Sequence, residues 1–185
     1  MQMNSLSFFI IGISYKNANA ETRGKYSLDT KSKLLLLDKA KEYNLESIMA
    51  VSTCNRTEVL GFVSNPEVLI NLLCEATNES KDNFKKYSYT LDGKAAVEHL
   101  FKVGSGLESQ ILGDFEIIGQ LKHSAAISKK KGLLNTSLEK LISLVIRASK
   151  KIKTETSMST GATSVSFASV QYICNNVQNI NDKNI

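Results

Sequence analysis

The run from Leu6 to Tyr15 (LSFFIIGISY) constrains the fold of this 185-residue chain more than any other segment. It is nearly unbroken in its apolar character, short for a helix, and rich in Phe and Ile. Strands that are covered on both faces have such continuous apolar runs, whereas half-buried strands alternate apolar and polar residues. We therefore predict that this segment is a strand buried on both faces.

The remainder of the first half alternates between helical and extended patterns. A Leu and Lys pattern predicts a helix over 29–43, with Asp29 as its N-cap. Ser64 and Glu67 have the spacing of a capping box, and Pro66 fits the first turn of a helix that starts there. Three further strands are predicted from apolar runs, at 46–52, 57–64 and, more weakly, 84–90. The order predicts a small mixed sheet with helices on one side.

From residue 92 onward the apolar residues recur with a helical period. Thr136 and Glu139 have capping-box spacing at the start of one of these helices. The pattern predicts helices over 95–107, 115–131, 137–153 and 164–177. The fold class is therefore α+β, with a sheet-containing part over roughly 1–90 followed by a helical part.

Composition and charge exclude several classes of protein. Apolar residues make up 42% of the chain, which is enough for a buried core and argues against general disorder. No apolar run reaches the 18 residues of a membrane span, and no positive charge precedes the first apolar run as it would in a signal peptide. The net charge of +5 permits a polyanionic partner without requiring one.

Cys54 is the main candidate for a reactive side chain. The three cysteines are an odd number without short pair spacing, which argues against disulfides and zinc and fits a reducing cytoplasm. Cys54 lies in the polar connection 52–57 between two predicted strands, and Arg56 is close enough to favour the attacking thiolate. An incidental loop cysteine is the alternative. Cys74 lies on an apolar helix face and is predicted to be core.

Two other features have open interpretations. His99 lies beside the apolar face of its predicted helix, where a half-buried, satisfied histidine is as good an interpretation as a functional one. Glycines interrupt the helical pattern of 104–120, which predicts either a helix–turn–helix corner or a concave polar pocket. The start of that segment resembles half of a phosphate loop, but Ser109 replaces the third glycine and the segment follows a helix. No spacing of His, Cys, Asp and Glu suggests a metal site.

Taken together, these segments resemble the glutamyl-tRNA reductase family. The stretch 12–16 (GISYK) with Glu21-Thr22-Arg23 is similar to the family's opening motif. Residues 51–59 (VSTCNRTEV) resemble its signature around the active cysteine, and residues 99–120 (HLFKVGSGLESQILGDFEIIGQ) resemble its longest motif. The motifs follow one another in the family's order and separation.

The resemblance implies an architecture. Residues 1–90 would form a ferredoxin-like catalytic subdomain with a mixed or antiparallel sheet, and 91–160 a helical subdomain that completes the active site. Residues 161–185 would start a long spinal helix. The NADPH-binding domain and a C-terminal domain that forms a homodimer would lie outside these 185 residues.

The resemblance also implies a function. The family reduces glutamyl-tRNA to glutamate-1-semialdehyde with NADPH, the first step of tetrapyrrole (porphyrin) synthesis from glutamate. The reaction passes through a thioester on Cys54, and the residues present here would perform the acyl transfer only. A cytoplasmic enzyme with no membrane association is expected, with possible handover of the aldehyde to the aminomutase that consumes it.

Residue roles are implied by position. Cys54 would be the nucleophile and His99 a second catalytic residue. The substrate contacts would be Thr53, Asn55, Arg56, Ser109, Asp114, Phe115, Glu116 and Gln120. Arg56 is the natural partner of the substrate's side-chain carboxylate. At 114–116 the family more commonly has Glu, Pro and Gln, and Asp114 keeps a carboxylate for the substrate's α-ammonium that is shorter by one methylene.

Two alternatives remain open at this point. A cysteine hydrolase or acyltransferase could use Cys54 with His99 and would need no second domain. A non-catalytic tRNA-binding module could use the lysines at 129–131 and 150–153, and its binding would be sensitive to salt but indifferent to Cys54.

Overall fold

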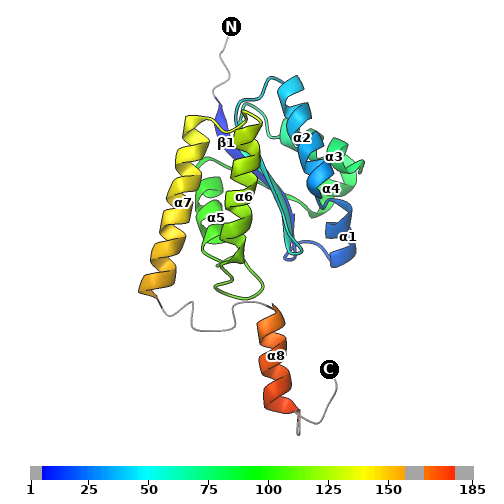
Figure 1. Ribbon diagram of the computed structural model, residues 1–185. Helices are drawn as coiled ribbons and strands as arrows, with labels where there is room; N and C mark the ends of the chain where they lie inside the picture. The colour runs from blue at the N-terminus through cyan, green and yellow to red at the C-terminus, as the bar shows by residue number, and fades with distance from the viewer. Residues whose placement is uncertain (1–5, 157–164, 178–185) are drawn as a thin grey trace.

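The computed structural model describes residues 6–156 and 165–177. At its centre is a sheet with helices around it (Figure 1), and the sheet has four strands. The strand order is β2-β3-β1-β4, and every neighbouring pair is antiparallel. The strands are β1 (Ser7–Ser14), β2 (Ile48–Ser52), β3 (Arg56–Val63) and β4 (Tyr89–Asp92). The α+β class predicted from the sequence is confirmed, and among the described strands the sheet is antiparallel rather than mixed.

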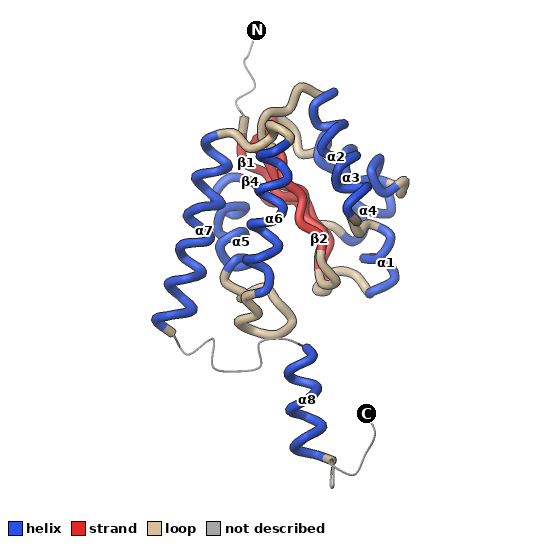
Figure 2. The backbone as a smooth tube through the Cα atoms, viewed as in Figure 1, coloured by secondary structure: helices blue, strands red, loops and turns tan. Residues whose placement is uncertain are grey.

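Helices cover both faces of this sheet, so the prediction of helices on one side is wrong (Figure 2). One layer contains α1 (Ala20–Lys25), α2 (Thr30–Glu42), α3 (Glu67–Thr77) and α4 (Lys81–Tyr87). The other contains α5 (Gly93–Gly104), α6 (Glu116–Lys130) and α7 (Thr136–Glu155). Helix α8 (Val165–Asn176) falls within the expected spinal helix, of which 161–164 and 178–185 lie outside the described residues.

The burial of β1 on both faces is confirmed. Ile11 and Ile13 point into a core shared with α2 and α3, whereas Phe8 and Ile10 point into a core shared with α5, α6 and α7. All four side chains are at most 5% exposed. Because each buried apolar side chain contributes about 1.5–3 kcal/mol, β1 links the two layers energetically.

Two predicted capping boxes are wrong. Helix α3 begins after Pro66, and the N–H of Glu67 donates to the side-chain oxygen of Asn65 over 2.9 Å instead of using Ser64. The N-cap of α7 is Asn135, whose side chain accepts from the N–H of Leu138 over 2.9 Å. Asn135 therefore caps α7, where Asn is at least as favourable as Ser or Thr, whereas the N-cap of α3 is Pro66 and no side chain caps that helix. The predicted Asp29 cap of α2 is confirmed.

The strand predicted at 84–90 is only partly correct. Most of that segment belongs to α4, and β4 begins at Tyr89. Phe84 supplied the apolar signal, but it is a helix residue whose ring packs edge-on against Tyr26 at 5.1 Å between centroids. Within the described residues, no helix is long and apolar enough to cross a lipid bilayer.

Candidate active site

A tight turn between β2 and β3 presents Cys54 to solvent. The N–H of Thr53 donates to the carbonyl of Arg56 over 2.8 Å, which closes the turn. The Thr53 hydroxyl accepts from the N–H groups of both Asn55 and Arg56 at 3.1 Å. These bonds pair backbone groups of the turn with one another and with the Thr53 hydroxyl, while the Cys54 side chain is exposed. The prediction that Cys54 is exposed and Cys74 buried is confirmed.

Arg23 and Tyr15 hold the backbone of this turn in place. The Arg23 guanidinium donates from Nε to the carbonyl of Cys54 over 3.2 Å and from Nη1 to the carbonyl of Ala18 over 2.7 Å. The N–H of Tyr15 donates to the carbonyl of Asn55 over 2.9 Å. Arg23 belongs to the Glu21-Thr22-Arg23 motif of the sequence, and its hydrogen bond fixes the backbone at Cys54.

The connection between α5 and α6 closes over the same edge of the sheet. The Tyr15 hydroxyl donates to the carbonyl of Ser109 over 3.3 Å, and Lys16 forms an ion pair with Glu108. Arg56 donates from Nη2 to the carbonyl of Glu108. These three contacts dock a segment more than 50 residues away in the sequence beside Cys54.

A cavity of about 60 Å³ lies where the Cys54 turn meets this connection. Its lining includes most of the residues that the sequence singled out, which supports the concave polar pocket over a simple helix corner. The lining residues are Thr53, Cys54, Asn55, Arg56, Ser109, Asp114, Glu116, Ile117 and Gln120. Of these, only the buried Ile117 was not anticipated.

Phe115 does not line this cavity. It is the residue before α6, and the ammonium of Lys153 lies 5.4 Å from the centroid of its ring. A substrate contact by its side chain stays a prediction that the lining of the cavity does not support.

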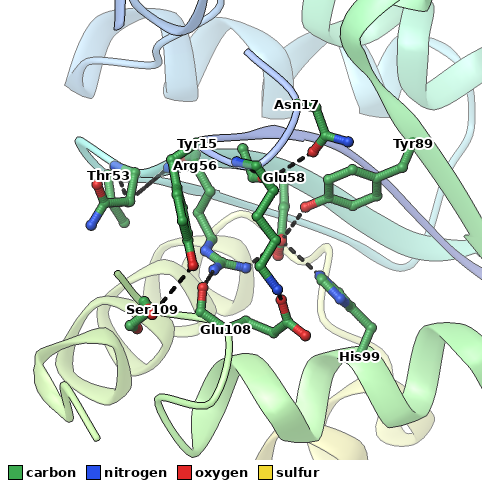
Figure 3. A network of polar contacts seen from close by, with 12 residues as sticks. Tyr15, Asn17, Thr53, Arg56, Glu58, Tyr89, His99, Glu108 and Ser109 are labelled. Atoms are coloured by element: carbon green, nitrogen blue, oxygen red, sulfur yellow. Dashed lines mark hydrogen bonds and ion pairs between the residues drawn. The ribbon is translucent and has the colours of Figure 1, made fainter. Parts of the chain in front are cut away.

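Arg56 is anchored rather than free. Its side chain is 4% exposed, and Nη1 donates to Oε1 of Glu58 over 3.0 Å while Nη2 donates to the carbonyl of Glu108 (Figure 3). The guanidinium therefore has a fixed orientation at the wall of the Cys54 cavity. In the described part of the chain, two of its nitrogens are used for this anchoring and the remaining N–H groups can serve a ligand.

Glu58 is the centre of a buried polar cluster. Besides Arg56, it accepts from the Tyr89 hydroxyl over 2.5 Å and is 2.8 Å from Nε2 of His99 (Figure 3). Burial alone would raise the pKa of Glu58, but the hydrogen bond with His99 and the charge of Arg56 outweigh it and lower the pKa to about 2. The same carboxylate raises the pKa of Tyr89, in addition to the effect of burial. Glu58 is thus an ionised carboxylate inside the fold.

Gly12 makes room for this cluster. In the sheet register Gly12 stands opposite Glu58 on one neighbouring strand and opposite Tyr89 on the other. A Cβ at position 12 would lie 2.8 Å from both side chains, closer than real contacts allow. Sequence reasoning did not single out Glu58. The available signal was an acidic residue inside an apolar strand, two positions from Arg56 and therefore on the same face.

His99 belongs to this cluster and not to the Cys54 cavity. It lines a separate cavity of about 240 Å³ that shares only Arg56 with the smaller one. Its side chain is 15% exposed, as expected for a half-buried, satisfied histidine. Its catalytic role stays a prediction.

A third cavity, of about 460 Å³, also reaches the Cys54 turn. It shares Thr53 and Cys54 with the small cavity, and it is otherwise formed by α1, the segment that follows it and the end of β2. Its lining residues are Ala20, Arg23, Gly24, Ser27, Leu28, Asp29, Ser52, Thr53 and Cys54.

The described residues show neither a metal site nor a dinucleotide loop. No group of three or more His, Cys, Asp and Glu side chains among them could hold a metal ion. The glycine-rich segment that starts at Gly104 follows α5 and not a strand. A dinucleotide cofactor would therefore not be held by the described residues through a phosphate loop of that kind.

Comparisons with known proteins place this site in context. Residues 11–156 match the family described as glutamyl-tRNAGlu reductase, N-terminal domain. The chain is 56% identical over 178 residues to a glutamyl-tRNA reductase of Christiangramia forsetii, covering 96% of this chain and 43% of the relative. It is 40% identical over 167 residues to that of Aquifex aeolicus, covering 88% and 41%.

A solved structure agrees with these sequences. The glutamyl-tRNA reductase from Methanopyrus kandleri superposes with a TM-score of 0.73 at 27% identity, covering 91% of this chain and 39% of that one. The chain therefore spans about two fifths of the length of the proteins that it matches.

Proposed function

The chain belongs to the glutamyl-tRNA reductase N-terminal domain family, and from this membership we propose that it performs the acyl-transfer half of the reduction of glutamyl-tRNA to glutamate-1-semialdehyde. The observation that carries the proposal is the position of Cys54, exposed on a rigid turn and lining a small polar cavity. The enzyme would act in tetrapyrrole synthesis. Formation of a glutamyl adduct after mixing with glutamyl-tRNA tests the proposal.

The proposed chemistry follows from the thiol and the ester. The sulfur of Cys54 attacks the carbonyl carbon that joins glutamate to the tRNA ribose, a C–S bond forms and the C–O bond breaks. The thiol proton passes through solvent to the departing ribose oxygen, so that the products are a glutamyl thioester and free tRNA. NADPH, which we expect to bind outside these 185 residues, would supply the hydride that reduces the thioester.

The small cavity complements the charges of a glutamyl group. Arg56 offers a fixed guanidinium to the side-chain carboxylate, since Glu58 and the Glu108 carbonyl hold it in place. Asp114 and Glu116 contribute carboxylates that suit the α-ammonium. The arrangement favours glutamate over glutamine, because only glutamate provides a negative partner for Arg56.

We expect Arg56→Lys to reduce acylation by glutamyl-tRNA by about 10- to 100-fold, the loss of a charge-assisted hydrogen bond of roughly 1.5–3 kcal/mol. Lysine keeps the charge but cannot bridge Glu58, the Glu108 carbonyl and a substrate carboxylate together. Alkylation by iodoacetamide, which is small and neutral, should be little changed. Intact-mass kinetics with the two reagents measure both rates on the same protein.

The rates with glutamyl-tRNA and with iodoacetamide distinguish two roles of Arg56, recognition of the substrate carboxylate and activation of the Cys54 thiol. If Arg56 mainly favours the thiolate, lysine should preserve both rates. Equal losses in the two assays would instead mean that the turn itself is disturbed. A melting temperature within a few degrees of the parent protein is the control, because Arg56 is buried.

The geometry does not favour the two alternatives raised by the sequence. A Cys54–His99 hydrolase needs the imidazole beside the thiol, whereas His99 is hydrogen-bonded to Glu58 in a separate cavity. For a tRNA-binding module, the lysines at 129–131 and 150–153 would have to be available. Several of these have acidic or aromatic partners, through the pairs Lys129–Glu139, Lys131–Asp38, Lys151–Glu155 and Lys153–Phe115.

Family membership supports three further parts of the proposal. The complete protein would work in the cytoplasm, it would form a homodimer through a domain outside these residues, and it would pass its aldehyde to an aminomutase. These three points rest on the family alone.

A further inference from the structure

We propose that the 460 Å³ cavity beside Cys54 receives the leaving side of the ester, the 3′-terminal nucleotide of the tRNA. This inference rests on the proposed function and adds a binding site to it. The residues that would form the site are Arg23, Gly24, Ser27 and Asp29, none of which the sequence analysis assigned to substrate binding.

The position of Cys54 between two cavities is the first argument. A carbonyl carbon at the sulfur has two substituents that diverge, the acyl chain and the alkoxy oxygen with its ribose. Cys54 and Thr53 line both cavities, so that the two substituents can enter different spaces. The 60 Å³ cavity holds the charges that suit a glutamyl group, which leaves the other cavity for the alkoxy side.

Size supports the same assignment. The large cavity, of about 460 Å³, lies in the range of roughly 300–1,000 Å³ that is usual for small-molecule sites, which is large enough for a nucleotide. The cavity behind Arg56 is smaller and does not include Cys54 in its lining, so an ester attacked at Cys54 would not extend into it.

The polar groups of the large cavity match a nucleotide. Arg23 uses Nε and Nη1 to hold backbone carbonyls, which fixes its plane and leaves Nη2 for a phosphate or ribose oxygen. Ser32 donates to Oδ1 of Asp29 from both its N–H and its hydroxyl, at 2.7 Å each, and this orients the carboxylate. A carboxylate can accept from a ribose hydroxyl, the group that distinguishes RNA from DNA.

Substitutions of Gly24 test whether the large cavity receives the end of the tRNA. It lies in α1 and lines the cavity, and a Cβ built there meets no atom within 4 Å. A Cβ can therefore be added at position 24 without meeting another atom, and a side chain is at least as favourable as glycine in a helix. The series Gly24→Ala, Gly24→Leu and Gly24→Phe adds bulk in steps at a residue that lines the cavity.

Two acyl donors that differ only in the leaving group test the two cavities independently. The 185-residue chain is acylated without NADPH, either by glutamyl-tRNA or by the α-methyl thioester of glutamate, whose leaving group is a single methylthio group. We expect Gly24→Phe to slow acylation by glutamyl-tRNA at least about tenfold more than acylation by the thioester, with the smaller substitutions in between. Intact mass follows both reactions.

Gly119→Phe is the matched control. Gly119 is also a helical glycine whose added Cβ meets no atom within 4 Å, and it lines neither Cys54 cavity. It should leave the ratio of the two rates unchanged. Equal slowing of both donors by Gly24→Phe, or no slowing, would overturn the inference. If the unmodified chain formed no adduct with either donor, the proposed function itself would fail.

Discussion

Mixing the 185-residue chain with glutamyl-tRNA in the absence of NADPH should add one glutamyl group per chain, and Cys54→Ser should slow this reaction by roughly three orders of magnitude or more. A serine hydroxyl without an adjacent base is a far weaker nucleophile than a thiolate. His99, the catalytic histidine that the family resemblance implies, is hydrogen-bonded to Glu58 in a cavity whose lining does not include Cys54, so it is not placed to act as a base for position 54.

The other two cysteines should not substitute for Cys54. Cys74 is 3% exposed, and burial raises the pKa of its thiol to about 11, so that it is neither accessible nor ionised at neutral pH. Cys174 is exposed on α8 but lines none of the three cavities around Arg56 and Cys54.

Intact mass gives the stoichiometry of this reaction, and lability to neutral hydroxylamine distinguishes a thioester in the parent chain from an oxygen ester in the Cys54→Ser variant. Cys174→Ser is the matched control and should be acylated like the parent protein. A hydroxylamine-labile adduct that survives Cys54→Ser at Cys74 or Cys174 would overturn the assignment of the nucleophile.

Periodicity predicted most of the fold because its cause is local. The apolar run that became β1 and the helical repeats of α2, α5, α6 and α7 each reflect which side of one element is buried. The errors arose where two local signals compete. Asn135 and Thr136 are both good caps, and the structure uses Asn135.

The candidate active site also has one part that local sequence patterns predict and one part that they do not. The exposed turn around Cys54 follows from its polar residues between two strands. Ser109, Asp114, Glu116 and Gln120, which the family resemblance named, line the same cavity as Cys54, and their contact with a substrate stays a prediction. The cluster around Glu58 could not be predicted, because it depends on the register of β3 and β4 against β1 and on the packing of α5. Periodicity does not determine register between strands that are distant in the sequence.

Glu58→Gln should reduce the free energy of unfolding at pH 7 by roughly 3 kcal/mol, because removing one partner of a buried ion pair leaves the other charge uncompensated. Arg56 would keep its buried guanidinium without the carboxylate 3.0 Å away, and Tyr89 and His99 would lose an ionised acceptor. Urea unfolding followed by circular dichroism measures the change.

The acid dependence of stability provides an independent readout of the same carboxylate. The pKa of Glu58 is lowered from 4.5 to about 2 on folding, so the unfolded chain binds its proton at a higher pH than the folded protein. The stabilisation is therefore complete above about pH 4.5 and is lost as the pH falls toward 2, by an amount of roughly 3 kcal/mol. Glu58→Gln should remove this part of the acid dependence.

Glu139→Gln is the matched control for both measurements. Glu139 pairs with Lys129 on the surface and is 46% exposed, so its removal should cost less than about 1 kcal/mol and leave the acid dependence intact. If the parent protein and Glu58→Gln lost stability equally between pH 5 and 3, Glu58 would not be an ionised buried carboxylate. Arg56 would then lack the ion pair that orients it toward the Cys54 cavity. Its proposed recognition of the substrate carboxylate would require another group that fixes the guanidinium.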